Sequence, residues 1–333
     1  MKRLIKLNHP ARICSYAAVG GKKEGEGPLG RLFSYIDQSD RFGMPTFEQA
    51  EAESQALALN FALSKVGMKE RDLEAILAGD LLNQCASSSY GLMNSGVPFL
   101  GIFGACSTSS EGLLIAAQLL ESRHYRHVGV VSSSHFCSAE RQFRSPVEYG
   151  GQRAPTAQWT VTGSGAFVLG GEEHSGVFIT ETLIGRIVNA GVNDPANMGA
   201  AMAPAALDTF LSFFENSGTK PFDYDLILTG DLGYEGSAIF RELMAQRGFP
   251  ADNHNDCGLL IYDRDMQDVH AGGSGCGCAA SVLATKILPS MERGELKSVL
   301  FAATGALMSA DAVKQGLTIP AICHLVHLET KEG

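Results

Sequence analysis

Cys106 is the residue with the clearest chemical potential in this sequence. It stands in the stretch Gly104-Ala-Cys-Ser-Thr-Ser-Ser, between an apolar segment that begins at Phe99 and an apolar helical pattern that reaches Leu120. A thiol at such a strand-to-helix turn meets unpaired backbone N–H groups and the positive end of the helix dipole, which lower its pKa and attract anions. With Ser107, the turn predicts either an activated nucleophile or the floor of a carboxylate site. The alternative is a packed core thiol.

Three further side chains are candidates for the same site. His135 follows a predicted strand, so it either reaches the cavity or caps the chain locally. Arg141 and Arg144 suit a dianionic aromatic acid, because a guanidinium binds a carboxylate bidentately. Their alternative is an exposed loop in which they pair with Glu140.

Cysteine and histidine also gather toward the C-terminal end, at His254, Cys257, His270, Cys276 and Cys278. Their spacing fits no standard zinc pair, so we predict no metal site. The glycines of the same region predict no phosphate loop, since neither a P-loop lysine nor a dinucleotide fingerprint accompanies them. We therefore expect no cofactor.

Composition limits the classes of protein to which the chain can belong. It has 333 residues, of which 45% are hydrophobic and 19% charged, enough to bury a large core. Its net charge of −10, with no basic stripe, argues against nucleic acid as a partner. Its eight cysteines fit free thiols in a reducing compartment. With no apolar span of about 20 residues and no secretory signal, we expect the protein on the cytosolic side.

The elements that must position Cys106 occur twice. Residues 45–63 predict a helix and residues 72–82 a buried strand ending in Gly-Asp-Leu, and residues 203–214 and 223–232 repeat this order. Asp231 stands 151 residues after Asp80, and Cys276 stands 170 residues after Cys106. The larger second offset predicts an insertion near residues 248–270. We expect two α/β halves, residues 1–172 and 173–333, that pack by pseudo-symmetry as one compact unit.

A tandem α/β repeat with a cysteine at the first strand-to-helix turn resembles the thiolase-like fold of thiolases and ketoacyl synthases, with five layers of helix and sheet. In those enzymes the second half supplies a His and an Asn, or two His, near the positions of Asp231 and Cys276. Neither position holds those residues here. Because a Claisen step needs a base and an oxyanion donor, we expect a pseudo-enzyme whose Cys106 is a vestigial nucleophile.

Motifs spread along the chain are similar to one family within that superfamily, stage V sporulation protein AD. They are residues 26–30, 79–83, 103–109, 139–144, 148–152, 202–206, 254–258 and 271–276. The resemblance implies binding of dipicolinic acid, free or with calcium, for its uptake into the developing spore. It also implies membrane subunits of the stage V sporulation channel complex as partners, attachment to the spore inner membrane through them, a role extending to germination, and a homodimer.

On this reading the ligand-binding residues are Cys106, Ser107, His135, Arg141, Arg144, Asp231, His254 and Cys276. Two alternatives stay open. One is a condensing enzyme that uses Cys106, with His135 or His254 as its base. The other is a scaffold subunit whose cavity is a relic.

Overall fold

One large sheet runs through the computed structural model, which describes residues 3–140, 153–170 and 175–331. Within these residues the sheet joins twelve strands. The strands of the first half are β1 (Leu4–Gly20), β2 (Tyr35–Ile36), β3 (Ala75–Gly79), β4 (Phe99–Gly101), β5 (His127–Ser134) and β7 (Gly163–Gly170). Those of the second half are β8 (Gly176–Leu183), β9 (Val188–Asn189), β10 (Leu226–Thr229), β11 (His254–Asp256), β13 (Ser298–Ala306) and β14 (Pro320–Lys331). A separate parallel pair consists of β6 (Trp159–Thr160) and β12 (Gly273–Ser274).

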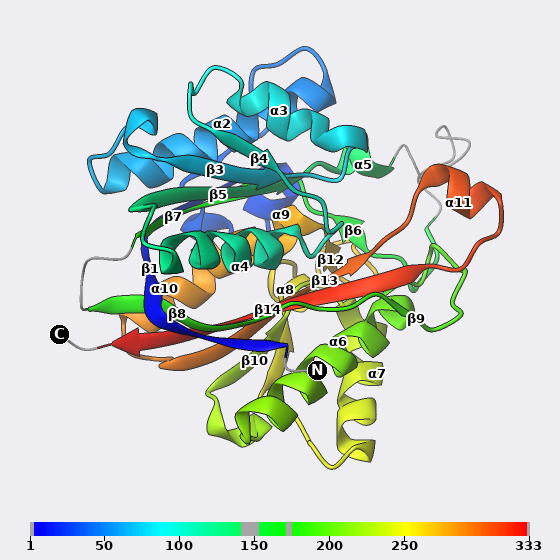
Figure 1. Cartoon of the computed structure of the whole chain (residues 1–333). Helices are drawn as coiled ribbons and strands as arrows, with labels where there is room; N and C mark the ends of the chain where they lie inside the picture. The colour runs from blue at the N-terminus through cyan, green and yellow to red at the C-terminus, as the bar shows by residue number, and fades with distance from the viewer. Residues whose placement is uncertain (1–2, 141–152, 171–174, 332–333) are drawn as a thin grey trace.

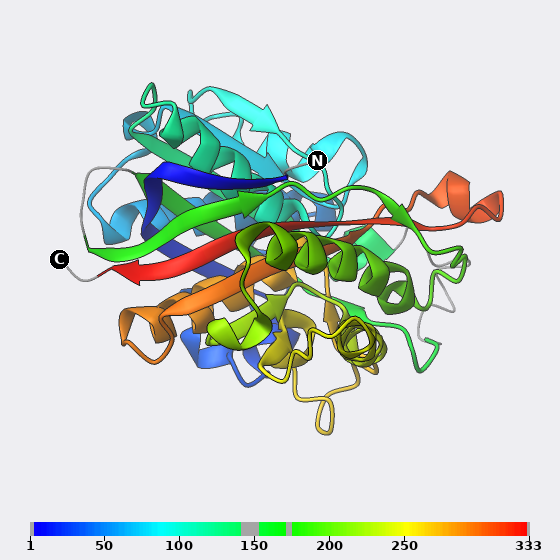
Figure 2. The same cartoon turned by 60° about the horizontal axis from the view of Figure 1, so that its bottom comes forward.

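The two halves of the sheet have the same topology. Their strand orders are β4-β3-β5-β7-β1 and β11-β10-β13-β14-β8. In each, the first two pairs are parallel and the last two pairs are antiparallel. An antiparallel pairing of β1 with β8, with Leu4 opposite Leu183, joins the halves. Figure 2 shows β1, β8 and β14 side by side. The repeated α/β architecture predicted from the two sequence landmarks is confirmed.

Helices cover both faces of each half-sheet and give five layers (Figure 1). The outer layers are α2 and α3 on one side and α6 and α7 on the other, while α4 and α9 lie between the half-sheets. The α-helices are α1 (Lys22–Gly25), α2 (Phe47–Lys65), α3 (Ala86–Leu92), α4 (Thr108–Glu121), α5 (Phe136–Glu140), α6 (Met198–Ser217), α7 (Gly233–Gln246), α8 (Cys257–Leu260), α9 (Cys276–Val282), α10 (Leu288–Glu292) and α11 (Ala310–Lys314). Short 3₁₀ turns are η1 (Gly30–Leu32), η2 (Glu70–Asp72), η3 (Asn83–Cys85) and η5 (Pro221–Asp223), and the π-helical turn η6 (Leu283–Ile287) follows α9.

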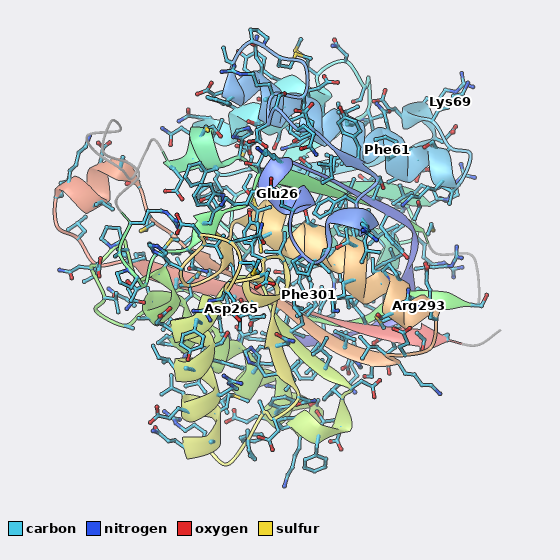
Figure 3. The ribbon with its side chains drawn as sticks, turned by 180° about the vertical axis from the view of Figure 1, so that it is seen from behind. Glu26, Phe61, Lys69, Asp265, Arg293 and Phe301 are labelled. Carbon is cyan, nitrogen blue, oxygen red and sulfur yellow. The ribbon has the colours of Figure 1, made fainter. Side chains whose placement is uncertain are left out.

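Small residues let the central helices lie close to the strands. Every residue of α9 is buried, and the helix contains only Cys, Gly, Ala, Ser and Val. A Cβ added to Gly277 would lie 2.3 Å from the carbonyl oxygen of Gly163, and one added to Gly165 would lie 2.6 Å from the Cβ of Ala280. These contacts are below van der Waals distance, so glycine is required there, and larger residues would push α9 off the sheet. Figure 3 shows Phe301 of β13 deep in the molecule, while Lys69 and Arg293 lie at its edges.

The observed elements agree with the sequence patterns within a few residues. The predicted helix at residues 45–63 is α2, the strand at 72–82 is the shorter β3, and the helix at 203–214 lies within α6. The region predicted to hold an insertion contains β11 and α8. One strand differs in its environment. β4 is apolar, yet Phe99 and Leu100 are 40% and 47% exposed because β4 is the last strand of the sheet.

Candidate functional site

A strained turn between β4 and α4 presents Cys106. Ala105, the residue before it, has a φ of +52°, a left-handed conformation that costs a non-glycine residue free energy. Side chains on either side hold the turn closed: the Ser107 hydroxyl donates to the Gly104 carbonyl at 2.7 Å, and the Thr108 hydroxyl donates to the Ala105 carbonyl at 2.7 Å. Cys106 is therefore fixed at the amino end of α4, with 5% of its surface exposed.

Asp231 lies behind Cys106 as a fully buried carboxylate. It follows β10 and accepts hydrogen bonds from the Thr304 hydroxyl at 2.9 Å, from the Ser274 hydroxyl at 3.0 Å and from the Gly275 backbone N–H at 3.0 Å. Ser274 completes the connection, because its Oγ lies 3.9 Å from the Sγ of Cys106. The two residues that the sequence placed together are thus joined through Ser274, which sequence reasoning did not select.

The electrostatics of this cluster oppose ionisation of the thiol. Burial raises the pKa of Cys106 well above its ordinary value, and the neighbouring Asp231 carboxylate raises it further. Burial also raises the pKa of Asp231, although the hydrogen bonds from Gly275, Cys106 and Thr304 favour its charged form. The expectation that the helix terminus lowers the pKa of Cys106 is therefore wrong for this fold, because desolvation and an adjacent carboxylate outweigh the helix dipole.

Cys276 occupies the corresponding turn of the second half but lies inside the protein. Its Sγ donates to the Ser133 carbonyl at 2.8 Å, and burial and the carboxyl groups of Glu51, Asp80 and Asp231 raise its pKa well above the ordinary value. The thiol of Cys276 contributes packing and one hydrogen bond. It supplies neither a base nor an oxyanion donor to Cys106.

Cys106 opens onto a cavity of about 200 Å³. For comparison, an engineered cavity of roughly 150 Å³ binds benzene, so the volume admits a six-membered aromatic ring. The walls combine apolar and polar side chains. They are Leu81, Asn83, Phe103, Ala105, Cys106, Ala139, Glu140, Arg153, Ala154, Ala157, Gln158, Thr160, Pro195, Ala196, Met198, Ser274, Ala306 and Met308.

Arg153 brings a positive charge to this cavity. Its side chain is only 3% exposed, and one amino group, Nη2, contacts the carbonyl and carboxylate of Asp268 at 2.9 and 2.8 Å. Its other amino group, Nη1, is buried and has no hydrogen-bond partner. The guanidinium also lies 4.7 Å from the ring centre of Trp159. A buried, unpartnered cationic N–H is costly, and an anionic ligand would satisfy it.

Gln158 is a second polar side chain of the cavity wall that sequence reasoning missed. Its amide donates to the carbonyls of Asp231 at 2.6 Å and Gly273 at 2.9 Å, which joins the wall to the Asp231 network. The quoted motif at residues 148–152 ends one residue before Arg153. The sequence feature that points to Arg153 is its place as a lone arginine between a glycine-rich motif and a short strand.

Of the other predicted site residues, Ser107, His135 and His254 lie outside the cavity wall. Ser107 lies under the turn rather than in the cavity wall. His135 is buried, with its Nε2 2.8 Å from the Asp40 carbonyl and its Nδ1 accepting from the Cys137 N–H. His254 contacts the Thr229 hydroxyl at 2.9 Å, and burial lowers its pKa to about 3. Neither histidine lines the cavity. Arg141 and Arg144 lie outside the described residues.

Among the described residues, no group of three or more His, Cys, Asp or Glu side chains is arranged to hold a metal ion. Their helices also include none that combines the length and apolar character needed to cross a membrane.

Comparison with known proteins gives the family. The family model for stage V sporulation protein AD (SpoVAD) matches residues 1–329. The stage V sporulation protein AD of Bacillus subtilis (strain 168) is 43% identical over 333 residues, covering 100% of this chain and 98% of that protein. This chain belongs to the SpoVAD family. The resemblance drawn from the motifs is therefore confirmed.

Comparison with solved structures shows that this member of the SpoVAD family has a thiolase-like fold. The 3-oxoacyl-[acyl-carrier-protein] synthase III of Aquifex aeolicus VF5 superposes with a TM-score of 0.57 at 15% identity, covering 96% of this chain and 99% of the other. A variant of Xanthomonas campestris OleA superposes with a TM-score of 0.60 at 15% identity, covering 98% and 100%. At this identity the likeness concerns the fold alone.

Proposed function

We propose that this sporulation protein binds dipicolinic acid, free or with calcium, in the cavity beside Cys106 and hands it to membrane partners during spore formation. The observation that carries the proposal is Arg153, a cavity-lining residue whose buried Nη1 has no hydrogen-bond partner. Membership of the SpoVAD family supplies the sporulation context.

The cavity matches the chemistry of a planar aromatic dicarboxylate. The pyridine ring would lie against apolar walls such as Leu81, Met198 and Met308, while one carboxylate would pair with Arg153. The second carboxylate would face the amino end of α4. Because the chain carries a net charge of −10, long-range attraction does not help a dianion approach. A local cation must therefore supply the recognition.

The same site lacks the parts of a condensing enzyme. Burial and the neighbouring Asp231 carboxylate keep the Cys106 thiol protonated at neutral pH by raising its pKa, and an ionised Asp231 cannot donate to an oxyanion. His135 and His254, which the enzyme alternative requires as bases, lie outside the cavity wall. These features support a pseudo-enzyme that retains the fold and uses the cavity for binding.

Calorimetric titration of dipicolinate tests the proposal. We expect saturable binding that a pyridine monocarboxylate does not reproduce. Arg153→Ala should weaken binding by about 10- to 100-fold, the value of one charge-assisted contact. Arg153→Lys should recover part of the affinity. The control is Arg293→Ala, since Arg293 is exposed and pairs with Glu295 at the molecular edge (Figure 3).

A negative result would separate the alternatives. If dipicolinate gives neither heat nor a thermal shift, with or without calcium, the binding proposal fails. Turnover of an acyl thioester that Cys106→Ala abolishes would then favour the enzyme. Retained binding of channel subunits without turnover would favour the scaffold.

Partner and location are parts of the same proposal. We place the protein at the cytoplasmic side of the forespore and spore inner membrane, bound to membrane subunits of the stage V sporulation channel complex, with a role extending to germination. The proposed homodimer is supported by β4, which pairs with β3 along one edge only among the described strands and exposes Phe99 and Leu100.

A further inference from the structure

A second constellation of chemical groups lies on the half-sheet formed by the C-terminal half. Neighbouring strands β13, β14 and β8 carry Ser298, His327 and Glu181, and all three side chains line an open groove of about 520 Å³. None of these residues lines the cavity beside Cys106. The groove and the cavity are therefore separate sites.

Hydrogen bonds connect the three side chains in series. The Oγ of Ser298 lies 2.8 Å from the Nε2 of His327, and the Nδ1 of His327 lies 3.2 Å from the Oε2 of Glu181. The Thr180 hydroxyl is a further neighbour of Nδ1, at 3.3 Å. With the ring proton on Nδ1, His327 donates to Glu181 and accepts from the Ser298 hydroxyl.

The surrounding residues fix this arrangement. The rings of Tyr224 and Phe213 pack edge-on against His327, with centroid distances of 5.1 and 6.3 Å. Lys6 holds the other oxygen of Glu181 at 2.9 Å. Burial works to raise the pKa of Glu181, but hydrogen bonds from His327 and Lys6 outweigh it and leave that pKa below its ordinary value. Glu181 is therefore a carboxylate at neutral pH.

We propose that Ser298 is a nucleophile activated by His327, that Glu181 positions the imidazole, and that the groove hydrolyses small carboxylic esters. This function is independent of dipicolinate binding. A nucleophile within hydrogen-bond reach of a base, which a third group orients, is the arrangement that acyl transfer to serine requires.

The reaction balances with water as the only co-reactant. As Ser298 Oγ forms a bond to the ester carbonyl carbon, its proton passes to His327 Nε2, which returns it to the departing alkoxide. Water then attacks the acyl-serine with His327 again as base, releasing the acid and restoring the serine. The backbone N–H of Ser298 donates to Asp225, so it is not the oxyanion donor. The ammonium group of Lys6 pairs with the Glu181 carboxylate, so its charge stabilises the carboxylate that orients His327.

The groove wall sets the substrate class. Leu7, Pro10 and the ring of Tyr224 supply a short apolar surface, while most other lining groups are polar or charged. The carboxylates of Glu329 and Asp223 disfavour an anionic leaving group through like-charge repulsion. Lys331 contributes a positive charge to the same groove wall. Small neutral esters such as acetates fit this mixture better than long acyl chains or polyanions.

Labelling of the full-length protein with a fluorophosphonate tests the nucleophile, because that reagent forms a phosphonyl-serine and expels fluoride. Peptide mass spectrometry should place the label on Ser298, and Ser298→Ala should abolish both labelling and hydrolysis of p-nitrophenyl acetate. Ser217→Ala is the matched control, since Ser217 lines the same groove but its Oγ bonds Thr219.

Two further variants assign the partners. His327→Gln should slow labelling by about 100-fold, within the range of general-base catalysis. Glu181→Gln keeps an acceptor oxygen but removes the charge beside the imidazole, among the titratable neighbours Lys6, Asp223, Tyr224, Glu329 and Lys331. It should shift the pH profile of labelling toward lower pH, which a purely structural role would not do.

The proposal is overturned if the folded protein takes no label, or if Ser298→Ala labels and hydrolyses as the unmodified chain does. Thermal melting of each variant shows that it is folded, so loss of signal has a chemical cause. Dipicolinate binding by Ser298→Ala, measured in parallel, keeps the two functions distinguishable.

Discussion

At the scale of single residues, Cys106 combines the position of a nucleophile with the environment of a core thiol. The turn holds it at the amino end of α4, yet burial and Asp231 keep its proton in place. We predict that iodoacetamide alkylates Cys106 slowly at neutral pH, and that Asp231→Asn accelerates the reaction about tenfold by removing the opposing charge.

Mass spectrometry of the alkylated peptides measures this rate. Buried Cys85 is the internal control, because burial and the Asp80 carboxylate, not Asp231, raise the pKa of its thiol. Rapid alkylation of Cys106 in the unmodified chain, slowed by Asp231→Asn, would contradict the assignment and favour an activated thiol.

The sequence located Cys106, Asp231 and Cys276 because they stand at the landmarks of a repeat. It could not give the direction of the pKa shift of Cys106, since that depends on burial and on a carboxylate brought from 125 residues away in the chain. Arg153 was missed for a similar reason. Its importance comes from an unsatisfied Nη1 inside the cavity wall, a property of packing that no local pattern carries.

At the scale of elements, Asp231 connects strands β10, β12 and β13 at the site through its place in the chain and its hydrogen bonds. It follows β10, accepts from Ser274 of β12 and accepts from Thr304 of β13. We expect Asp231→Ala to lower the free energy of unfolding by about 3 kcal/mol, because it leaves buried donors without an acceptor. The melting temperature should fall by roughly 4 °C.

Asp231→Asn is the matched variant. It retains an oxygen for Ser274 and Gly275, and the Thr304 hydroxyl can accept from its amide, so the loss should be clearly smaller. Equal melting temperatures for Asp231→Ala and the unmodified chain would show that this network does not stabilise the join between the strands.

The order of elements was predictable because each half repeats a strand, a glycine turn and a helix with clear apolar periodicity. The exposure of β4 was not predictable, since an apolar strand looks the same in sequence at the centre and at the edge of a sheet. Its position depends on which strands pair, and the pairing of β3 with both β4 and β5 is a long-range result.

The open edge of β4 leads to the prediction for the homodimer. We expect Leu100→Lys to raise the dissociation constant of the dimer at least about tenfold, because it puts a charge where two apolar edges meet. Sedimentation velocity over a range of concentrations measures it. Phe222→Lys is the control, as Phe222 is 75% exposed at η5. A dimer that survives Leu100→Lys and dissociates in the control would place the interface elsewhere.

At the scale of the whole molecule, the protein buries several ionisable groups in uncharged form. Burial raises the pKa of Glu51 to about 8, with a further contribution from Asp80, and burial raises the pKa of Glu24 and Asp256 to about 7. Burial lowers the pKa of His254 to about 3 and of His324 to about 4. Folding therefore links to proton binding in two opposite directions.

The buried carboxyls and the buried histidines change the stability of the fold over different ranges of pH. A buried carboxyl with a raised pKa stabilises the fold below its unfolded pKa, about 4.3, and this stability is lost as pH rises through 7 to 8. The two histidines contribute stability above their unfolded pKa, about 6.5, and lose it as pH falls toward 4 and 3. Between about pH 6.5 and 8 only the carboxyls still change, so the melting temperature should fall as pH rises.

Glu51→Gln isolates the largest of these contributions. The neutral amide keeps the shape of the protonated acid, and the Ser138 hydroxyl can turn from Glu51 to the His135 carbonyl, 3.1 Å away. Scanning calorimetry from pH 6 to 9 should show a shallower decline for Glu51→Gln than for the exposed control Glu242→Gln. Each carboxyl that ionises changes the free energy of unfolding by about 1.4 kcal/mol per pH unit, so the difference between the variants is measurable. Parallel declines in the two variants would mean that Glu51 is already ionised in the folded protein and that its charge is compensated inside the core.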